Sequence, residues 1–334
     1  MRVEPSARGA VEDRTLLRER MRAVLDRAEL RVPQESLHHP AAVETVHLVQ
    51  RALRTGPLGP DRLRSFSERL DRVPPAPVCA AAAPQGHLSR SVARALRSVP
   101  ARGADSPTVT ADVVEWEESE RDVLEAALGL LQRVLPRNAA ELRATVVEVA
   151  LLGGAAIDGF TDFAVHGAVL VNRSRLLDSP DGLPGAVRCA EALVHEGAHT
   201  RCNAAAVAEP FLLPDGAGRA GAEQSGQLLV ATPLRADPRP LAGLFQQTVV
   251  LARSVLLYRA LAPEPFPDPG PAAVGARYAK LLDGARQAVR TLAAHPDSLT
   301  PHGRTVLAEC AAVTGEPVRD GGYVPEDSGP GGPA

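Results

Sequence analysis

The chain has 334 residues, 45% of them hydrophobic and 23% charged, and its formal net charge is -3 at pH 7. This hydrophobic content is sufficient for a substantial core, and the small negative charge argues against nucleic acid or an anionic membrane as a partner. The four cysteines form no C-x-x-C pair, and neither a signal-like segment nor an apolar run of about 18 residues is present, so we expect a reduced, soluble, cytoplasmic protein.

The first part of the chain is predicted to be helical. Apolar residues recur at the spacing of one helix face in residues 12–30 and again in residues 41–54. Two segments rich in proline and alanine or glycine, residues 73–86 and 99–109, are predicted to be loops. Residues 1–110 are therefore expected to form a helical N-terminal region.

A small sheet and a series of helices are predicted for the rest of the chain. Two β-rich runs, residues 145–154 and 167–174, are expected to be strands. The segments with helical periodicity are residues 121–135, 184–209, 240–261, 276–295 and 303–313. The tail, residues 319–334, is polar and rich in glycine and proline, and it is predicted to be disordered. The predicted fold is mainly α, with a small β-sheet preceding the helix of residues 184–209.

This helix carries an H-E-x-x-H motif, His195-Glu196-Gly197-Ala198-His199. Positions four apart lie on one face of a helix, so His195 and His199 can present two imidazoles to one metal ion. In zinc peptidases, the glutamate of this motif takes a proton from the metal-bound water. We therefore expect residues 111–318 to form a metal-binding catalytic domain, with His195 and His199 as ligands and Glu196 as a catalytic residue.

The third ligand would decide between classes of metal enzyme, and the sequence leaves it open. The longer peptidase pattern H-E-x-x-H-x-x-G-x-x-H is absent, because Cys202 and Ala205 stand where its glycine and its last histidine belong. Glu223 and Glu209 lie downstream, but both are interpreted as solvated residues. A zinc metallopeptidase is retained as an alternative. Cys202 is interpreted as a packed thiol.

The segment that follows contains two arginines in a proline-rich stretch. Between Pro233 and Pro240 the chain has little conformational freedom, since proline fixes φ. Arg235 and Arg239 could each hold a carboxylate with two parallel hydrogen bonds. The other interpretation is that both arginines are ordinary surface residues.

The blocks AEALVHEGAH (residues 190–199), TPLRADPRPLAG (232–243) and LTPHGRTVL (299–307) together resemble a known family. The chain is similar over roughly residues 145–312 to the HExxH-type peptide β-hydroxylases of bacterial natural-product clusters. The resemblance implies an enzyme that uses iron(II), 2-oxoglutarate and O2 to hydroxylate the β-carbon of a residue in a ribosomally synthesised precursor peptide. It also implies other maturation enzymes of the same cluster as partners, and residues 1–110 become a candidate for peptide recognition.

The resemblance also implies roles for individual residues. His195 and His199 would be iron ligands, Glu196 would have an orienting role, and Arg235 or Arg239 would hold the distal carboxylate of 2-oxoglutarate. Gln246 stands where the family typically has a histidine that could serve as the third ligand. An amide oxygen can bind iron, although more weakly than an imidazole nitrogen.

Three outcomes therefore stay open for the third ligand. Gln246 binds the metal, another residue such as His166 or Glu223 takes its place, or the site is impaired and the chain is a peptide- or partner-binding protein. Leu234 is a second departure, since the family has tryptophan there.

Two further interpretations concern the substrate and the histidines near the start of the chain. One hypothesis is that a peptide could add as a strand beside residues 168–174. His38 and His39, in SLHHP, could contact a metal ion, but they are interpreted as residues of a solvated loop.

Overall fold

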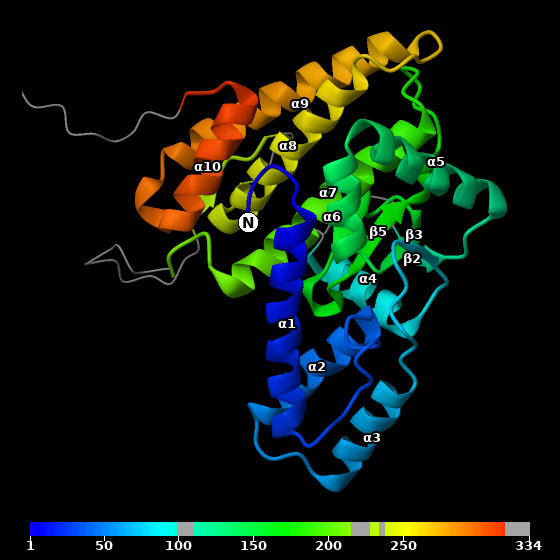
Figure 1. Ribbon diagram of the computed structural model, residues 1–334, viewed down its shortest axis with the longest axis vertical. Helices are drawn as coiled ribbons and strands as arrows, with labels where there is room; N and C mark the ends of the chain where they lie inside the picture. Colours follow the sequence, from blue (N-terminus) through cyan, green and yellow to red (C-terminus); the bar gives the residue numbers. More distant parts are fainter. Residues whose placement is uncertain (99–109, 215–227, 234–237, 318–334) are drawn as a thin grey trace, which may run out of the picture.

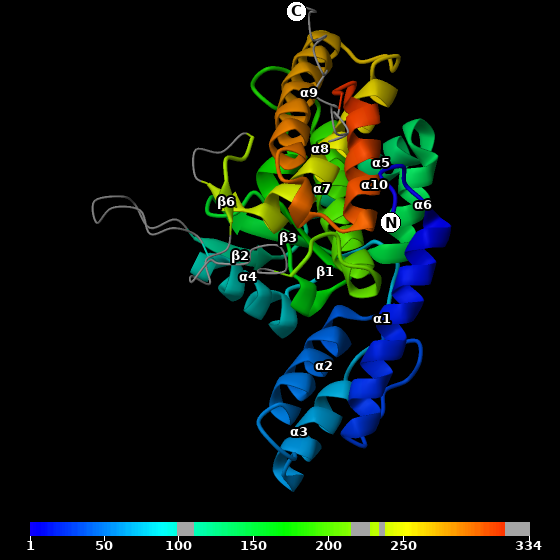
Figure 2. The ribbon, with the colours of Figure 1, turned by 90° about the vertical axis from the view of Figure 1, so that its left-hand side faces the viewer.

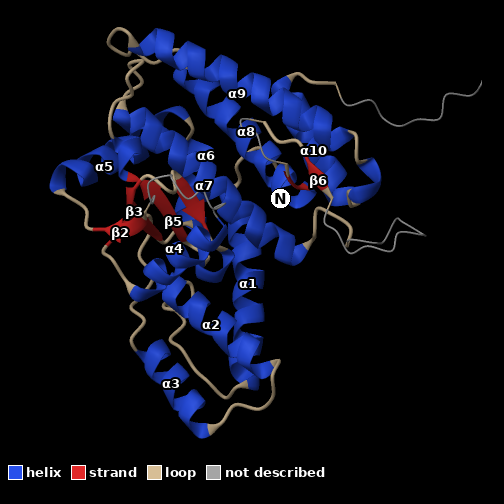
Figure 3. Cartoon of the chain, turned by 180° about the vertical axis from the view of Figure 1, so that it is seen from behind, coloured by secondary structure: helices blue, strands red, loops and turns tan. Residues whose placement is uncertain are grey.

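The computed structural model describes residues 1–98, 110–214, 228–233 and 238–317. Its described part is mainly helical with a small mixed sheet, as the sequence predicts (Figures 1 and 3). The helices are α1 (Ala7–Arg27), α2 (Pro40–Leu53), α3 (Pro60–Asp71), α4 (Gly86–Ser98), α5 (Glu118–Val134), α6 (Pro136–Thr145), α7 (Gly185–Ala208), α8 (Leu241–Leu261), α9 (Gly270–Ala293) and α10 (Pro301–Thr314). The strands are β1 (Ala80–Ala82), β2 (Ala111–Val114), β3 (Glu148–Gly154), β4 (Gly159–Thr161), β5 (Ala168–Asn172), β6 (Leu229–Val230) and β7 (Arg239–Pro240).

The main sheet has β3 and β5 at its centre. These two strands are parallel, with Glu148 opposite Ala168, and they are the two strands that the sequence predicts. β4 pairs antiparallel with the outer side of β5. On the other side of β3, β1 pairs parallel with its first half and β2 pairs antiparallel with its second half. Among the described strands, β4 therefore forms one edge of the sheet.

The two faces of the sheet are covered by different helices. Side chains alternate along a strand, so neighbouring residues of β3 belong to different parts of the core. Val149 and Leu151 pack in the cluster that contains the side chains of α7, whereas Ala150 and Leu152 pack with those of α4. Helix α7 thus lies on one face and α4 on the other (Figure 2).

The first three helices form the narrow end of the molecule, with a hydrophobic cluster of their own (Figures 1 and 2). They are not separate from the rest, because α1 also packs against α6 and α7. The prediction of a loop over residues 73–86 is wrong for β1, whose three alanines pair with β3. Alanine has a low intrinsic strand propensity, so this pairing depends on the neighbouring strand and not on local preference.

Helix α8 is long and apolar enough to cross a membrane by length and composition alone. This is weak evidence, since 72% of its apolar window is buried inside the protein and Arg253 lies in its middle. A core helix of a soluble protein passes the same test, because a helix surrounded by other helices is apolar on most of its faces. The cytoplasmic location stays a prediction.

Some sequence predictions lie outside the described residues. They are the loop of residues 99–109, the disordered tail of residues 319–334, the roles of Glu223 and Arg235, and the replacement at Leu234.

Candidate functional site

The H-E-x-x-H motif lies in the middle of α7, which is central to the molecule. This helix packs against α1, α5, α6 and α8 and against strands β4 and β5. Its first turn is fixed by Asp178, whose side chain accepts a hydrogen bond of 2.7 Å from the backbone N–H of Gly185. Gly197, inside the motif, allows α6 to come close, because a Cβ there would lie 2.3 Å from Leu142. The motif is therefore held in place from several sides.

His195 and His199 lie side by side, as the spacing predicts. Their ring centroids are 5.1 Å apart, and both side chains are half-buried. Two residues outside the motif continue the same spacing of four, Glu191 before it and Asn203 after it. All four therefore form a polar stripe along one face of α7, and both ends of this stripe contact α8.

Gln246, in the second turn of α8, contacts His199 directly. Its Oε1 lies 2.9 Å from His199 Nδ1, and its Nε2 donates to Asn203 Oδ1 at 3.0 Å. Because the amide nitrogen is engaged with Asn203, the amide oxygen faces the ring, and Nδ1 of His199 is therefore the nitrogen that carries hydrogen. The lone pair is then on Nε2, the atom that can bind a metal ion. This is the contact of a residue that orients a metal-binding histidine.

A substitution tests this orienting contact. Gln246→Ala is expected to weaken binding of a divalent metal at His195 and His199 about 10- to 100-fold, since residues that orient ligands typically have effects of this size. Gln246→Glu should restore most of the affinity, because a carboxylate also accepts the Nδ1 hydrogen. Metal titration followed by calorimetry measures both. A loss of binding as complete as in His199→Ala would instead assign Gln246 as a ligand.

Glu196 points away from this stripe toward the edge of the sheet. Its Oε2 accepts a hydrogen bond of 2.6 Å from Thr161 of β4. A Cβ at Gly159 would lie 2.6 Å from Glu196 Oε1, so a larger residue at position 159 would require the Glu196 carboxylate to move. Burial raises the pKa of Glu196 to about 7, and Asp158 adds to this, while the Thr161 hydrogen bond and Arg175 oppose it. The motif carboxylate is thus enclosed between α7 and β4.

Arg239 is placed at the beginning of α8, the helix that carries Gln246. It lies in β7. Gln246 follows seven residues later, which corresponds to roughly 10 Å of rise along a helix. The preceding segment is joined to α8 as well, because Gln247 Nε2 donates to the backbone oxygen of Pro233 at 2.9 Å. The proposed role of Arg239 toward a carboxylate stays a prediction.

The sequence analysis missed the polar residues that fix α7 against α8 and α9. Glu191 is buried, accepts a hydrogen bond of 2.6 Å from Tyr258 and forms an ion pair with Arg277. Asn203 holds Gln246 in the same way at the other end of the stripe. The signal that could have found both is their spacing of four residues from the motif histidines.

Two other residues singled out in the sequence are buried. Cys202 is a packed thiol, fully buried, and its burial raises its pKa to about 12. His166 lies before β5, and its ring is 6.1 Å from that of Phe163. Burial lowers the pKa of His166 to about 4, and the nearby His38, His47 and Arg201 contribute to this.

The burial of His166 predicts a pH dependence of stability. Its pKa in the folded state is about 4, below the ordinary value of 6.5, so the folded protein excludes a proton that the unfolded chain binds. The contribution of His166 to the free energy of unfolding is complete above pH 6.5. As the pH falls from 6.5 toward 4, this free energy decreases by about 3 kcal/mol in total. In His166→Gln, the decrease in unfolding free energy between pH 7 and 4.5 should be smaller by about 2 kcal/mol. Urea denaturation at the two pH values measures this difference. A decrease in His166→Gln as large as in the unsubstituted protein would contradict the prediction.

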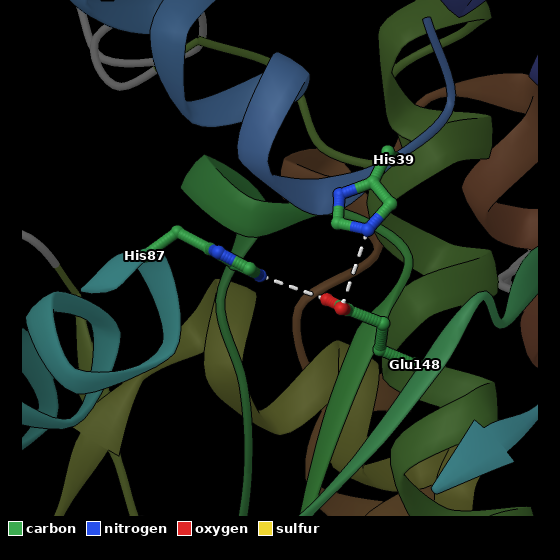
Figure 4. A group of neighbouring side chains, drawn as sticks. All are labelled: His39, His87 and Glu148. Carbon is green, nitrogen blue, oxygen red and sulfur yellow. Dashed lines mark hydrogen bonds and ion pairs between the residues drawn. The ribbon is translucent and has the colours of Figure 1, made fainter. Parts of the chain in front are cut away.

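Another group of side chains that could bind a metal ion comes from α2, α4 and β3 (Figure 4). His39, His87 and Glu148 are buried, and their ligand atoms all lie within 4.8 Å of one another. This group could bind a metal ion. Placing His39 in a solvated loop is therefore wrong: the side chain is 1% exposed, because it caps α2 at the point where this helix meets β3.

No protein-family model matches the chain, and no curated protein that was compared with it is recognisably similar in sequence. The resemblance to the peptide β-hydroxylases therefore stays a prediction.

Proposed function

We propose that the chain is an iron(II)- and 2-oxoglutarate-dependent oxygenase that hydroxylates the β-carbon of a residue in a ribosomally synthesised precursor peptide. The observation that supports this most is the contact between His199 and Gln246, which are 47 residues apart in sequence. It joins the H-E-x-x-H helix to the helix that follows the D-P-R-P segment. His199 belongs to the first of the three blocks that carry the resemblance, and Gln246 follows the second block by three residues.

The imidazoles of His195 and His199 on α7 are suited to binding iron(II). Two imidazoles leave several positions for a third ligand, a bidentate 2-oxo acid and O2, as non-haem iron oxygenases require. When bound, iron(II) supplies the oxidising chemistry: O2 is consumed, 2-oxoglutarate becomes succinate and CO2, and one oxygen atom enters the peptide. Gln246 is proposed to keep the Nε2 lone pair of His199 directed at the metal.

The arginines and Glu196 are given supporting roles. Arg239, with Arg235, is proposed to bind the distal carboxylate of 2-oxoglutarate through paired hydrogen bonds. Glu196 is proposed to orient the site from within, since its carboxylate is already engaged with Thr161 of β4.

The structure corrects the hypothesis about which strand receives the peptide. Residues 168–174 contain β5, which has β3 on one side and β4 on the other, so the hypothesis that a peptide adds beside this strand is wrong. The edge strand is β4, which lies directly over Glu196. We propose that the peptide pairs with β4, where main-chain hydrogen bonds would place it next to the metal-binding helix.

The experiment is an anaerobic reconstitution of the full chain. Protein loaded with iron(II) is given 2-oxoglutarate, a candidate precursor peptide and then O2. Succinate together with a mass gain of one oxygen atom on the peptide supports the proposal. If succinate forms slowly and the peptide gains no oxygen, the protein turns over 2-oxoglutarate but the candidate peptide is not its substrate. Another precursor peptide would then be tested.

A zinc peptidase is the second candidate, and the raised pKa of Glu196 favours it. Burial raises this pKa to about 7, which suits a general base, although the hydrogen bond with Thr161 directs the carboxylate toward β4. Peptide cleavage that needs zinc and no 2-oxoglutarate would replace the first proposal. Failure to bind either metal at His195 and His199 would favour a peptide- or partner-binding protein, the third reading of the sequence.

A further inference from the structure

We propose that His39, His87 and Glu148 form a structural zinc site that fastens the N-terminal helices to the sheet, separate from the metal proposed at α7. Glu148 belongs to the same face of β3 as Ala150 and Leu152, the face covered by α4. Helix α7 covers the opposite face. The two groups of ligands therefore cannot share one ion.

The geometry of the group supports a common ligand. Glu148 Oε2 lies 2.8 Å from His87 Nε2, and Glu148 Oε1 lies 3.4 Å from His39 Nε2, so both imidazoles converge on one carboxylate (Figure 4). Two imidazole nitrogens and one carboxylate oxygen are a donor set typical of zinc, whereas calcium and magnesium prefer oxygen alone. Gln85 Nε2 donates a hydrogen bond of 3.3 Å to Glu148 Oε1 and so helps to hold the carboxylate, and a water molecule would complete four-fold coordination.

The location of the three residues indicates a structural role. His39 is the N-cap of α2, His87 lies in the first turn of α4, and Glu148 begins β3. The side chains are at most 3% exposed, which leaves no route for a substrate to reach an ion bound among them. An ion there would connect three segments that are far apart in the sequence.

The competing interpretation is that the group is a buried carboxylate held by N–H donors alone. His39 Nδ1 accepts a hydrogen bond of 3.2 Å from the backbone N–H of Ala41, so in the metal-free group its Nε2 carries the hydrogen that faces Glu148. Zinc at Nε2 would move this hydrogen to Nδ1 and end the contact with Ala41. Zinc would thus replace the Ala41 contact and the contacts of both imidazoles with Glu148 by three metal–ligand bonds.

The test uses the full chain with His195 and His199 both replaced by alanine, so that it does not depend on the proposed function. After exposure to zinc and dialysis, this double variant should retain about one zinc per chain. Adding His39→Asn should remove it, because asparagine still caps a helix but lacks Nε2. His295→Asn in the same background is the matched control and should retain the ion.

Stability gives a second readout. Zinc should raise the Tm of the double variant and leave the Tm of the His39→Asn variant unchanged, since an ion that binds only the folded state stabilises it. Cobalt(II) in the double variant should give the visible spectrum of a four-coordinate site. Absence of zinc from a folded double variant, with no change in Tm and the spectrum of aqueous cobalt, would overturn the proposal and leave the N–H-held carboxylate.

Discussion

Replacement of His195 or His199 by alanine is expected to remove metal binding at α7 and to lower succinate formation about a thousand-fold or more. The reason is that the metal provides the binding position for the 2-oxo acid and for O2, and loss of several kcal/mol of stabilisation corresponds to such a factor. The measurement is succinate formation by the full chain under saturating iron(II), with 2-oxoglutarate and O2. Metal content by mass spectrometry is recorded on the same samples.

Two controls separate the loss of the metal from the loss of the fold. His295→Ala removes a half-buried histidine near the end of α9 and should retain both metal binding and turnover. The circular dichroism of the His195 and His199 variants should remain that of a mainly helical protein, because both rings are only half-buried. Undiminished turnover in His195→Ala would show that the motif is not the site of the reaction.

The largest effect on stability is expected for Glu141→Leu. Glu141, on α6, is buried and forms ion pairs with Arg253 of α8 and Arg201 of α7, and it accepts a hydrogen bond of 2.8 Å from the backbone of Ser6. Leucine would leave two buried guanidinium groups without this carboxylate. Breaking a buried ion pair from one side typically costs about 3–5 kcal/mol, which is a large fraction of the stability of a domain.

Urea denaturation measures the change in unfolding free energy. The matched control is Glu12→Gln, which breaks the exposed pair with Arg8 on α1 and should change stability by less than about 0.5 kcal/mol. Arg201 also pairs with Asp13 of α1, so part of its charge stays compensated in Glu141→Leu. A change below about 1 kcal/mol would show that this remaining pair, or water, replaces Glu141.

The elements that the sequence predicts well are those with a local physical cause. The α7 helix follows from apolar residues at helical spacing, and the pairing of His195 with His199 follows from their separation of four. Strands β3 and β5 follow from runs of β-branched and other apolar residues that are buried on both faces. Each of these depends on residues within one short segment.

The features that the sequence does not predict depend on which segments meet. The three alanines of β1 form a strand only because β3 offers them hydrogen-bonding partners. His39 is buried because α2 and α4 both begin beside β3, and nothing in SLHHP distinguishes it from a histidine of a solvated loop.

By itself, the sequence determined the mainly helical fold, the two central strands and the adjacency of His195 and His199, because period and spacing act along a single element. Only the tertiary structure decided that Gln246 meets Nδ1 of His199, that Glu196 faces β4, and that His39, His87 and Glu148 converge. The physical reason is that packing between distant elements selects these contacts. The free energy of such packing depends on the burial of whole surfaces and not on the residues next to each side chain in the chain.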